Sequence, residues 1–304
     1  MRPDTNTGIE LQVSHQTVTR YTSRVEVAYH CAYLQPLDCA GQRVGDFVLI
    51  IDPPPSHSAS ALDAFGNVRT EFAFYVPHEE LTVRAESRVW LDSTPARPDP
   101  SAAVAWDEVA SGMRYTSGGT FRPASEFVFE SPYVPLDPAL RSYAALTFAP
   151  GRPYLHAAIE LMERIHGDFA YEAGVTDVGT PLVEVFRQRR GVCQDFAHLM
   201  LAMLRALGLP ARYVSGYLLT RQTPDQARLL GADASHAWVS IWCPVLGWVD
   251  LDPTNAVLPA STHVTVAVGR DYGDVVPLRG VVRGGADHAL EVAVAVTPVT
   301  ARAV

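Results

Sequence analysis

The sequence predicts an α+β protein: an N-terminal antiparallel β-sandwich, followed by a domain in which one buried helix packs on an antiparallel sheet. Residues 8–92 contain repeated segments that are rich in β-branched and aromatic residues. Residues 193–207 carry apolar side chains at helical spacing. Further strand-like segments follow that helix and do not alternate with helices, an order typical of α+β domains and not of a βαβ repeat.

The bulk composition is that of a globular protein. The chain has 304 residues, of which 48% are hydrophobic and 19% are charged, enough for two modest domains with a hydrophobic core. Its net charge of −9 argues against a nucleic-acid partner, which would need a basic surface. The first residues are polar, and no segment approaches the roughly 20 apolar residues of a membrane span. We therefore expect a cytoplasmic protein that binds neither nucleic acid nor membrane; the sequence leaves its oligomeric state open.

The four cysteines, Cys31, Cys39, Cys193 and Cys243, form no CxxC pair and are too few for a disulfide framework. Cys31 and Cys39 could meet across a hairpin, but two free thiols are the simpler expectation in the cytoplasm. The sequence contains no HExxH, GxxxxGK[ST] or GxSxG motif. It therefore predicts neither a cofactor nor a bound metal.

Residues 8–92 are predicted to form the sandwich. Their strand-like segments are ELQVSHQTVTRY, SRVEVAYHCAYLQPL, DFVLIIDP, NVRTEFAFYV and LTVRAESRVWL. Turn-forming clusters rich in Asp, Pro, Gly and Ser separate these segments, as they do in a compact antiparallel domain. No set of residues in this part has the pattern of a catalytic site, so we assign no chemistry to it.

A proline-rich connector over 93–152 joins the sandwich to the second domain, which is predicted to span 153–299. The connector contains STPARPDP, SPYVPLDP and FAPGRP, and prolines at this density interrupt regular structure. The second domain opens with two helical patterns, YLHAAIELMERIHGDF and TPLVEVFRQRR, before the buried helix. The strand-like segments after that helix are ARYVSGYLL, HAWVSIW, WVDLDPT, HVTVAVG and LEVAVAV, with a polar loop over 221–234 between the first two.

The buried helix places Cys193 at its beginning. Apolar residues recur from Phe196 to Leu207, Gly208 can take the left-handed conformation after the last turn, and Pro210 prevents continuation. A thiol at a helix N-terminus faces unpaired backbone N–H groups and the positive end of the helix dipole, which favour the thiolate. The same N–H groups can stabilise an oxyanion, so this position suits covalent acyl chemistry if a base is available.

Two histidines could serve as that base. His198 lies five residues along the same helix, roughly 140° around its axis at about 100° per residue, so it points away from the thiol. His236 begins a strand that can hold it rigidly against the helix N-terminus, and it is the better candidate. Asp250 and Asp252 lie two residues apart on the next strand, and either carboxylate could orient the imidazole.

The segments GVCQDFAHLMLAMLRALGLPARYVSGYL and SHAWVSIWCPVLGWVDLDPTN strongly resemble the transglutaminase-like domain of the papain-like cysteine-protease superfamily. In that family the nucleophile lies in a G-x-C-x-[DE]-[FY]-A segment, the histidine precedes A-W, and the aspartate lies in D-P-T or D-A-T. The resemblance implies Cys193 as nucleophile, His236 as base and Asp252 as orienting carboxylate, whereas Asp250 does not match the motif. DAFGN, VPHEELTVRAES and HVTVAVGRDYGDVVPLRGVVRGG resemble the flanking segments of a bacterial subgroup, so the likeness covers nearly the whole chain.

Neighbours of these residues are candidates for the substrate cleft. Gln194 could shape the site, Tyr272 could border the cleft, and Trp238 could either shield the imidazole from water or fill the core. Asp195 is expected to be structural, because a carboxylate in the first helical turn interacts favourably with free N–H groups.

The sequence thus predicts a thiol-dependent acyl-transfer enzyme that forms a thioester with a peptide or protein amide, in the first instance a cysteine peptidase or amidase. One alternative is a crosslinking transglutaminase with the same triad, and another is a binding or scaffold module in which the triad is idle. A metal site of Cys193, His198 and His236 is a third, which their spacing disfavours. The preference for hydrolysis rests on the resemblance to two-domain bacterial proteins without an evident Ca²⁺-binding loop.

Overall fold

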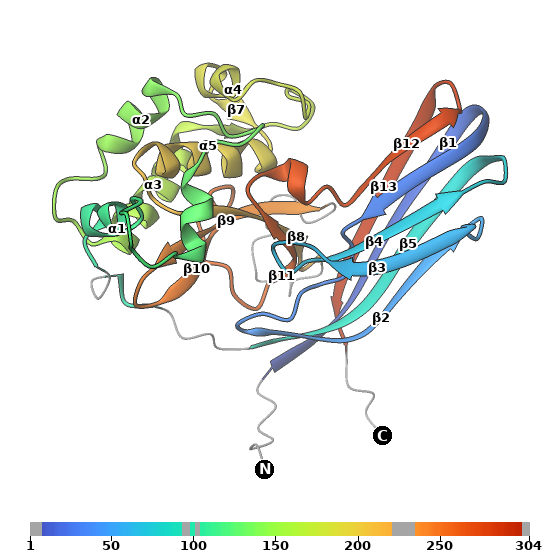
Figure 1. Cartoon of the computed structure of the whole chain (residues 1–304), viewed down its shortest axis with the longest axis horizontal. Helices are drawn as coiled ribbons and strands as arrows, with labels where there is room; N and C mark the ends of the chain where they lie inside the picture. Colours follow the sequence, from blue (N-terminus) through green and yellow to red (C-terminus); the bar gives the residue numbers. More distant parts are fainter. Residues whose placement is uncertain (1–7, 93–97, 101–103, 221–234, 300–304) are drawn as a thin grey trace, which may run out of the picture.

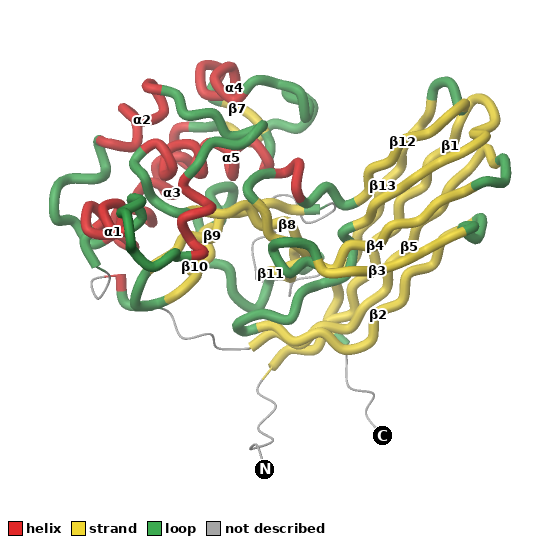
Figure 2. Tube along the Cα trace, viewed as in Figure 1, coloured by secondary structure: helices red, strands yellow, loops and turns green. Residues whose placement is uncertain are grey.

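The computed structural model of the chain describes residues 8–92, 98–100, 104–220 and 235–299. A domain made of strands lies beside a body that contains the α-helices of these residues (Figure 1 and Figure 2). The polar loop predicted over 221–234 falls outside the described residues. The arrangement confirms the predicted α+β class, with an antiparallel strand domain before the helices.

The first five strands form one antiparallel sheet in the order β2-β5-β1-β4-β3. They are β1 (Gly8–Ala32), β2 (Gln42–Asp52), β3 (His57–Leu62), β4 (Val68–Phe74) and β5 (His78–Asp92). The first half of β1 pairs with β5 and its second half pairs with β4, so the sheet curls around this long strand. Apolar side chains inside the curl, among them Phe72, Phe74, Leu81 and Val83, form a core of their own. The strands predicted as a sandwich are therefore hydrogen-bonded into a single curled sheet that shares β1.

The last two strands belong to this same sheet. β12 (Leu278–Gly284) pairs with the second half of β1, and β13 (His288–Pro298) pairs with its first half. The range 153–299 predicted for the second domain therefore ends too late, because its final strands complete the N-terminal sheet. Alternating apolar residues indicate that a segment is a strand, but they do not specify which strand it pairs with.

A second antiparallel sheet, in the order β10-β9-β8-β11, carries the helices. Its strands are β8 (Ala211–Leu218), β9 (His236–Cys243), β10 (Gly247–Leu251) and β11 (His263–Gly269). The helix α5 (Cys193–Ala206) packs on β8 and β9, and α3 (Tyr154–Asp168) and α4 (Leu182–Gln188) pack on α5. Most side chains of α5 are buried, as its apolar pattern predicts. Gly208 follows the helix with a φ of 78°, the left-handed conformation expected there.

The proline-rich connector is part of the helical body. It contains the helices α1 (Trp106–Gly112) and α2 (Pro138–Ala145) and the 3₁₀ segment η2 (Pro123–Val128). Leu140, Tyr143 and Ala144 of α2 lie in the same buried core as α5. The boundary predicted between residues 152 and 153 therefore falls inside one packed unit. Prolines reveal where regular structure is interrupted, but they do not reveal where the intervening helices pack.

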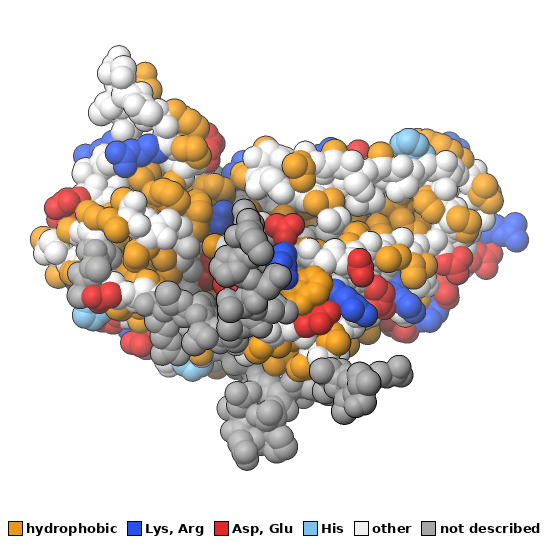
Figure 3. Space-filling model, turned by 90° about the horizontal axis from the view of Figure 1, so that it is seen from below, with side chains coloured by type: hydrophobic (Ala, Val, Ile, Leu, Met, Phe, Trp, Pro, Cys, Tyr) orange, Lys and Arg blue, Asp and Glu red, His pale blue; other side chains and the backbone are white. Residues whose placement is uncertain are grey.

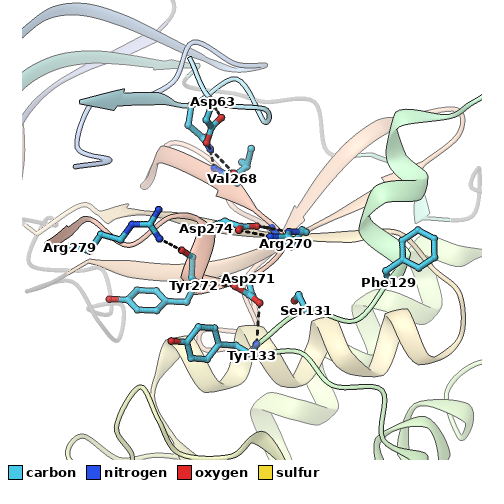
Figure 4. Close-up of polar contacts among 12 residues, drawn as sticks. Asp63, Phe129, Ser131, Tyr133, Val268, Arg270, Asp271, Tyr272, Asp274 and Arg279 are labelled. Atoms are coloured by element: carbon cyan, nitrogen blue, oxygen red, sulfur yellow. Dashed lines mark hydrogen bonds and ion pairs between the residues drawn. The ribbon is translucent and has the colours of Figure 1, made fainter. Parts of the chain in front are cut away.

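Two buried amide side chains join the two sheets. β11 is an edge strand, and its outer backbone groups need hydrogen-bond partners. Gln42 Nε2 donates to Thr265 O at 2.7 Å, and Thr265 N donates to Gln42 Oε1 at 2.8 Å. Asn67 pairs in the same way with Val268, at 2.7 and 2.8 Å, and its amide also donates to Asp63. Asp63 and Val268 are labelled at the top of Figure 4. These amides therefore take the place of a neighbouring strand.

The surface of the strand domain carries charges of both signs. Exposed ion pairs cross its strands, such as Arg20–Glu80 at 2.9 Å and Arg88–Glu10 at 3.4 Å. Red and blue side chains are interspersed along this domain on the face in Figure 3. Among the described helices, none combines the length and the hydropathy that a membrane span requires. The four cysteines are free thiols.

Candidate active site

Cys193 is the first residue of α5, where the sequence predicts it. A two-stranded parallel sheet, β6 (Ala170–Tyr171) and β7 (Arg190–Gly191), leads the chain into this helix. The first helical hydrogen bond runs from Phe196 N to Val192 O at 3.1 Å, so the N–H groups of residues 193–195 have no acceptor within the helix. The thiol is partly exposed and lies at the positive end of the helix dipole.

Asp195 fixes the turn that precedes the thiol. Its Oδ2 accepts hydrogen bonds from Val192 N at 2.8 Å and from Thr176 Oγ1 at 2.6 Å. A Cβ atom at Gly191 would lie 2.5 Å from that oxygen, so any side chain there would displace the carboxylate. Burial raises the pKa of Asp195, and the two hydrogen bonds oppose this shift. These contacts support the structural role expected of Asp195.

His236, the first residue of β9, and Asp252, just after β10, form a buried pair. Nε2 of His236 donates to Oδ2 of Asp252 at 2.9 Å, and neither side chain is exposed. The other ring nitrogen of His236, Nδ1, is buried and has no hydrogen-bond partner among the described residues. Cys193 is nevertheless close enough to affect the pKa of this ring. The structure therefore brings the three residues together, with Nδ1 available to the thiol.

Burial and charge act in opposite directions on this pair. Burial disfavours the imidazolium, but the charge and hydrogen bond of Asp252, together with Cys193, outweigh it and raise the pKa of His236. Burial also disfavours the carboxylate, whereas His236 and His263 lower the pKa of Asp252 below its usual range. The arrangement therefore favours an ionised Asp252 beside a protonated His236, which is the partner that a thiolate requires.

The turn after β10 holds the Asp252 carboxylate in one orientation. Oδ1 accepts from Thr254 N at 2.9 Å and from Asn255 N at 3.3 Å, and Oδ2 accepts from Asn255 Nδ2 at 2.7 Å. Asp250 instead accepts a hydrogen bond from Trp238 Nε1 at 3.1 Å. The structure thus separates two carboxylates that their spacing in the sequence leaves equivalent.

His263, the first residue of β11, belongs to this network and is absent from the sequence-based site. Its Nε2 donates to Asp252 Oδ2 at 3.1 Å, and its Nδ1 accepts from Thr262 Oγ1 at 3.0 Å. Burial lowers the pKa of His263 against the opposing effect of Asp252, so the ring is a neutral donor. The only signal in the sequence is a histidine that opens a strand pattern, and the order of strands in the sheet is needed to place it beside Asp252.

Trp238 lies behind the imidazole and does not reach the cleft. Its ring stacks on His236 with centroids 6.1 Å apart at 29°, and it meets His263 edge-on at 5.2 Å. It is 0% exposed and also packs in a small core cluster with Val214 and Val268. The prediction that Trp238 lines the substrate cleft is therefore wrong in this structure, because a fully buried indole can shield the ring but cannot contact a substrate.

Tyr272 lies close enough to Cys193 for the thiol to affect its pKa, and Tyr133 lies next to Tyr272. Tyr272 opens the 3₁₀ turn η3 (Tyr272–Asp274), and its ring meets that of Tyr133 at 6.3 Å and 76°. Burial raises the pKa of Tyr272, and the neighbouring Tyr133 and Cys193 raise it further. Both rings are only partly buried, as is Gln194 next to the thiol. Tyr272 and Gln194 thus remain candidates for substrate contact.

His198 lies in the core and contacts both Tyr272 and Tyr133. Its Nε2 accepts from Tyr272 N at 3.2 Å, and its ring stacks in parallel on Tyr133 at 5.6 Å. Burial lowers the pKa of His198 to about 3, so it stays neutral and can accept this bond. Asp271 adds a hydrogen bond from Tyr133 N at 3.1 Å, drawn in Figure 4. His198 therefore makes the core hydrogen bond expected of it, and the alternative metal site with Cys193 and His236 loses one of its ligands.

One cluster of metal-type donors occurs among the described residues: His236, Asp252 and His263, whose donor atoms all lie within 4.8 Å of one another. In this cluster both Nε2 atoms already donate to the same carboxylate oxygen. A metal would have to replace both of these hydrogen bonds, so the donor set fits a hydrogen-bonded network better than a metal centre.

Two family models match this chain. The model of the transglutaminase-like superfamily matches residues 142–253, a range that contains Cys193, His236 and Asp252. The model of the bacterial transglutaminase-like N-terminal region matches residues 11–90. The chain belongs to the transglutaminase-like superfamily. The resemblance found in the sequence is thereby confirmed for both parts of the molecule.

Relatives of this transglutaminase-like protein occur in several bacteria. The Mycobacterium tuberculosis protein Rv2569c is 37% identical over 94% of this chain and 92% of its own length. The Mycobacterium leprae protein ML0607 is 33% identical over 94% of this chain and 98% of its own length. A protein-glutamine gamma-glutamyltransferase of Pseudomonas aeruginosa is 36% identical over 127 residues, which are 40% of this chain and 19% of that protein.

A solved structure has the same fold over almost the whole chain. A candidate cysteine protease from Cytophaga hutchinsonii superimposes with a TM-score of 0.73, covering 98% of this chain and 93% of its own at 18% identity. Together with the family, this fold supports a thiol-dependent acyl-transfer enzyme as the general class of the protein.

Proposed function

We propose that this protein hydrolyses a peptide or amide bond through Cys193, His236 and Asp252. One observation carries the proposal. His236 is fixed to Asp252 through Nε2, while its Nδ1 is buried without a hydrogen-bond partner and Cys193 is close enough to raise the pKa of the ring. A thiolate beside an oriented imidazolium is the arrangement that nucleophilic acyl transfer requires.

The reaction begins when the Cys193 thiolate attacks the carbonyl carbon of the substrate. Backbone N–H groups at the start of α5 hold the resulting oxyanion. As the intermediate collapses, the carbon–nitrogen bond breaks, and His236 gives its Nδ1 proton to the departing amine. A thioester with Cys193 remains, and His236 then takes a proton from the water that attacks it. Asp252 stays ionised throughout and holds the ring.

Amine transfer is the second candidate. The relative named as a protein-glutamine gamma-glutamyltransferase matches 40% of this chain, and its reaction would share the thioester while an amine replaces water. Cys193 is partly exposed, so water can reach a thioester formed there. This access supports hydrolysis as the principal outcome.

The first experiment measures whether the thiol is activated. Iodoacetamide alkylation of Cys193 is followed by intact mass across pH in wild type and in His236→Ala, with Cys193→Ala identifying reaction at the other thiols. We expect wild type to react well below the ordinary thiol pKa of about 8.5, and His236→Ala to lose this reactivity. Reaction only at alkaline pH, or indifference to His236, would reject the enzyme and leave an idle scaffold.

A second experiment separates the two reactions. Glutamine-containing peptides are incubated with the protein, with and without monodansylcadaverine, and the products are identified by mass spectrometry. Free acids or cleaved peptides that persist in the presence of the amine support hydrolysis. Products that carry the amine in preference to water would establish transfer instead. Cys193→Ser is the negative control for both.

A further inference from the structure

Two cavities lie between the strand domain and the helical body, and neither is lined by Cys193 or His236. One has a volume of about 810 Å³ and the other of about 920 Å³. Phe65, Arg212, Trp248 and Val268 line both, so Arg212 lies where the two cavities meet. Arg212 belongs to β8, and its chain neighbours Ala211 and Tyr213 are buried in the core beneath α5. Its side chain therefore points to the opposite face of the sheet, into the space between the domains.

The guanidinium of Arg212 has a charge that the described residues do not pair. Its Nε is buried and has no hydrogen-bond partner, and no ion pair or hydrogen bond to this side chain forms among the described residues. Burial lowers the pKa of Arg212, and Asp250 and Cys39 oppose this shift. Arg270, which lines the cavity of about 810 Å³, differs from Arg212 because its Nε and Nη2 each contact the Asp274 carboxylate at 2.9 Å (Figure 4). Arg212 as a whole is half-buried and has no anionic partner among the described residues, so its guanidinium is available to an anionic ligand that enters the space between the domains.

Aromatic rings surround this guanidinium. Arg212 lies over the ring of Trp248, 4.1 Å from its centroid. Trp242 meets Trp248 at 5.5 Å, and Phe127 meets it edge-on at 5.3 Å. Phe65, from the turn that carries Asn67, reaches Phe127 at 5.7 Å. The cavity of about 810 Å³ therefore offers flat apolar walls next to the positive charge of Arg212.

We propose that the interdomain cavity of about 810 Å³ binds an aromatic carboxylate. The carboxylate would lie on Arg212, and the ring would lie among Trp242, Trp248, Phe65 and Phe127. A guanidinium can donate two parallel hydrogen bonds to a carboxylate. Arg212 lies at both cavities and is available to a carboxylate, whereas Arg270 is already bonded to Asp274 and Arg122 lines only the cavity of about 810 Å³. The ligand is either a free aromatic acid or the carboxyl-terminal aromatic residue of a peptide, which present the same groups.

Binding is measured by calorimetry with N-acetylphenylalanine, and with N-acetylphenylalaninamide, which lacks the charge. Cys193→Ala protein serves as the host, so that binding is read independently of the proposed reaction. We expect the acid to bind about tenfold or more tightly than the amide, since a charged hydrogen-bonded pair is lost. The emission of Trp242 and Trp248 should change on titration with the acid. Equal affinities, or no saturable binding, would overturn the proposal.

Arg212→Met tests the residue itself. The variant should lose the preference for acid over amide, and its melting temperature should stay the same or rise because an unpaired charge is removed. Arg43→Met is the matched control, since Arg43 lies over Trp90 at 5.2 Å outside both cavities, and this variant should keep the preference. Retained discrimination in Arg212→Met would overturn the assignment, as would a lowered melting temperature with binding unchanged.

Further ligands identify the source of the carboxylate. Peptides that end in phenylalanine, as free acid or amide, are titrated beside N-acetylphenylalanine. Equal binding of the peptide acid and the small acid supports a peptide terminus, whereas binding of the small acid alone supports a metabolite-sized ligand. Phenyl phosphate that binds more tightly than either would overturn the carboxylate assignment.

Discussion

Two buried histidines in different parts of the molecule have pKa values shifted in opposite directions. His236 in the helical body donates to Asp252, and the carboxylate overcomes burial and raises the pKa of the ring. His30 in the strand domain stacks on Phe72 at 5.2 Å, and its Nε2 has no partner among the described residues. Burial, with the charge of His78, lowers the pKa of His30 to about 4. Burial acts in the same direction on both rings, and the carboxylate beside His236 accounts for the difference between them.

The largest expected effect comes from removing the negative charge beside His236. Asp252→Asn should lower the rate of peptide hydrolysis by about 10³- to 10⁴-fold, because the amide neither stabilises the imidazolium nor fixes its tautomer. Asp250→Asn is the control, because Asp250 accepts a hydrogen bond from Trp238, whereas the imidazole of His236 is bonded to Asp252. Rates of hydrolysis and of Cys193 alkylation measure both. A larger loss in Asp250→Asn would make Asp250 the orienting carboxylate.

Removing a fully partnered amide between the domains should cost stability. Asn67→Leu leaves the buried backbone N–H and carbonyl of Val268 without partners, and we expect a loss of about 2–4 kcal/mol in the free energy of unfolding. Urea denaturation measures it. Gln188→Leu, at an exposed amide, should change stability by less than about 0.5 kcal/mol. Equal effects would show that the amide pairing to β11 contributes little.

The unpartnered histidine should make the strand domain sensitive to acid. The pKa of His30 is about 4 when folded and 6.5 as its unperturbed value, so the unfolded chain binds the proton first as pH falls. Stability is therefore complete above pH 6.5 and decreases toward pH 4, by up to about 3 kcal/mol for this group. His30→Phe should flatten that decrease in denaturant melts recorded across pH. His57→Phe, at an exposed histidine, should leave it in place.

The smallest expected effect concerns the second donor to Asp252. His263→Leu removes one of the hydrogen bonds that orient the carboxylate, and we expect hydrolysis to slow by about tenfold. His263→Gln, which restores an N–H donor, should recover part of the rate. The pH dependence of Cys193 alkylation should shift in His263→Leu and return in His263→Gln. An unchanged profile in both would limit His263 to packing against Trp238.

Local patterns in the sequence were enough to predict a large part of this protein. The apolar spacing from Phe196 to Leu207 predicted α5, and Gly208 predicted its end, because helix period and capping depend on neighbouring residues. The position of Cys193 at the helix start followed from the same pattern. The strand position of His236 favoured it over His198 as the base, and the motif resemblance selected Asp252 over Asp250. The structure brings both residues together with Cys193.

Only the tertiary structure decided how distant segments combine. The pairing of β12 and β13 with β1, the place of His263 beside Asp252, and the burial of Trp238 all depend on strand order. The charge of Arg212, which has no partner among the described residues, is visible only once residues of both domains line the same cavity. Alternation and spacing record the period and burial of a segment, whereas strand partners and buried charges depend on residues that the chain brings together from far apart.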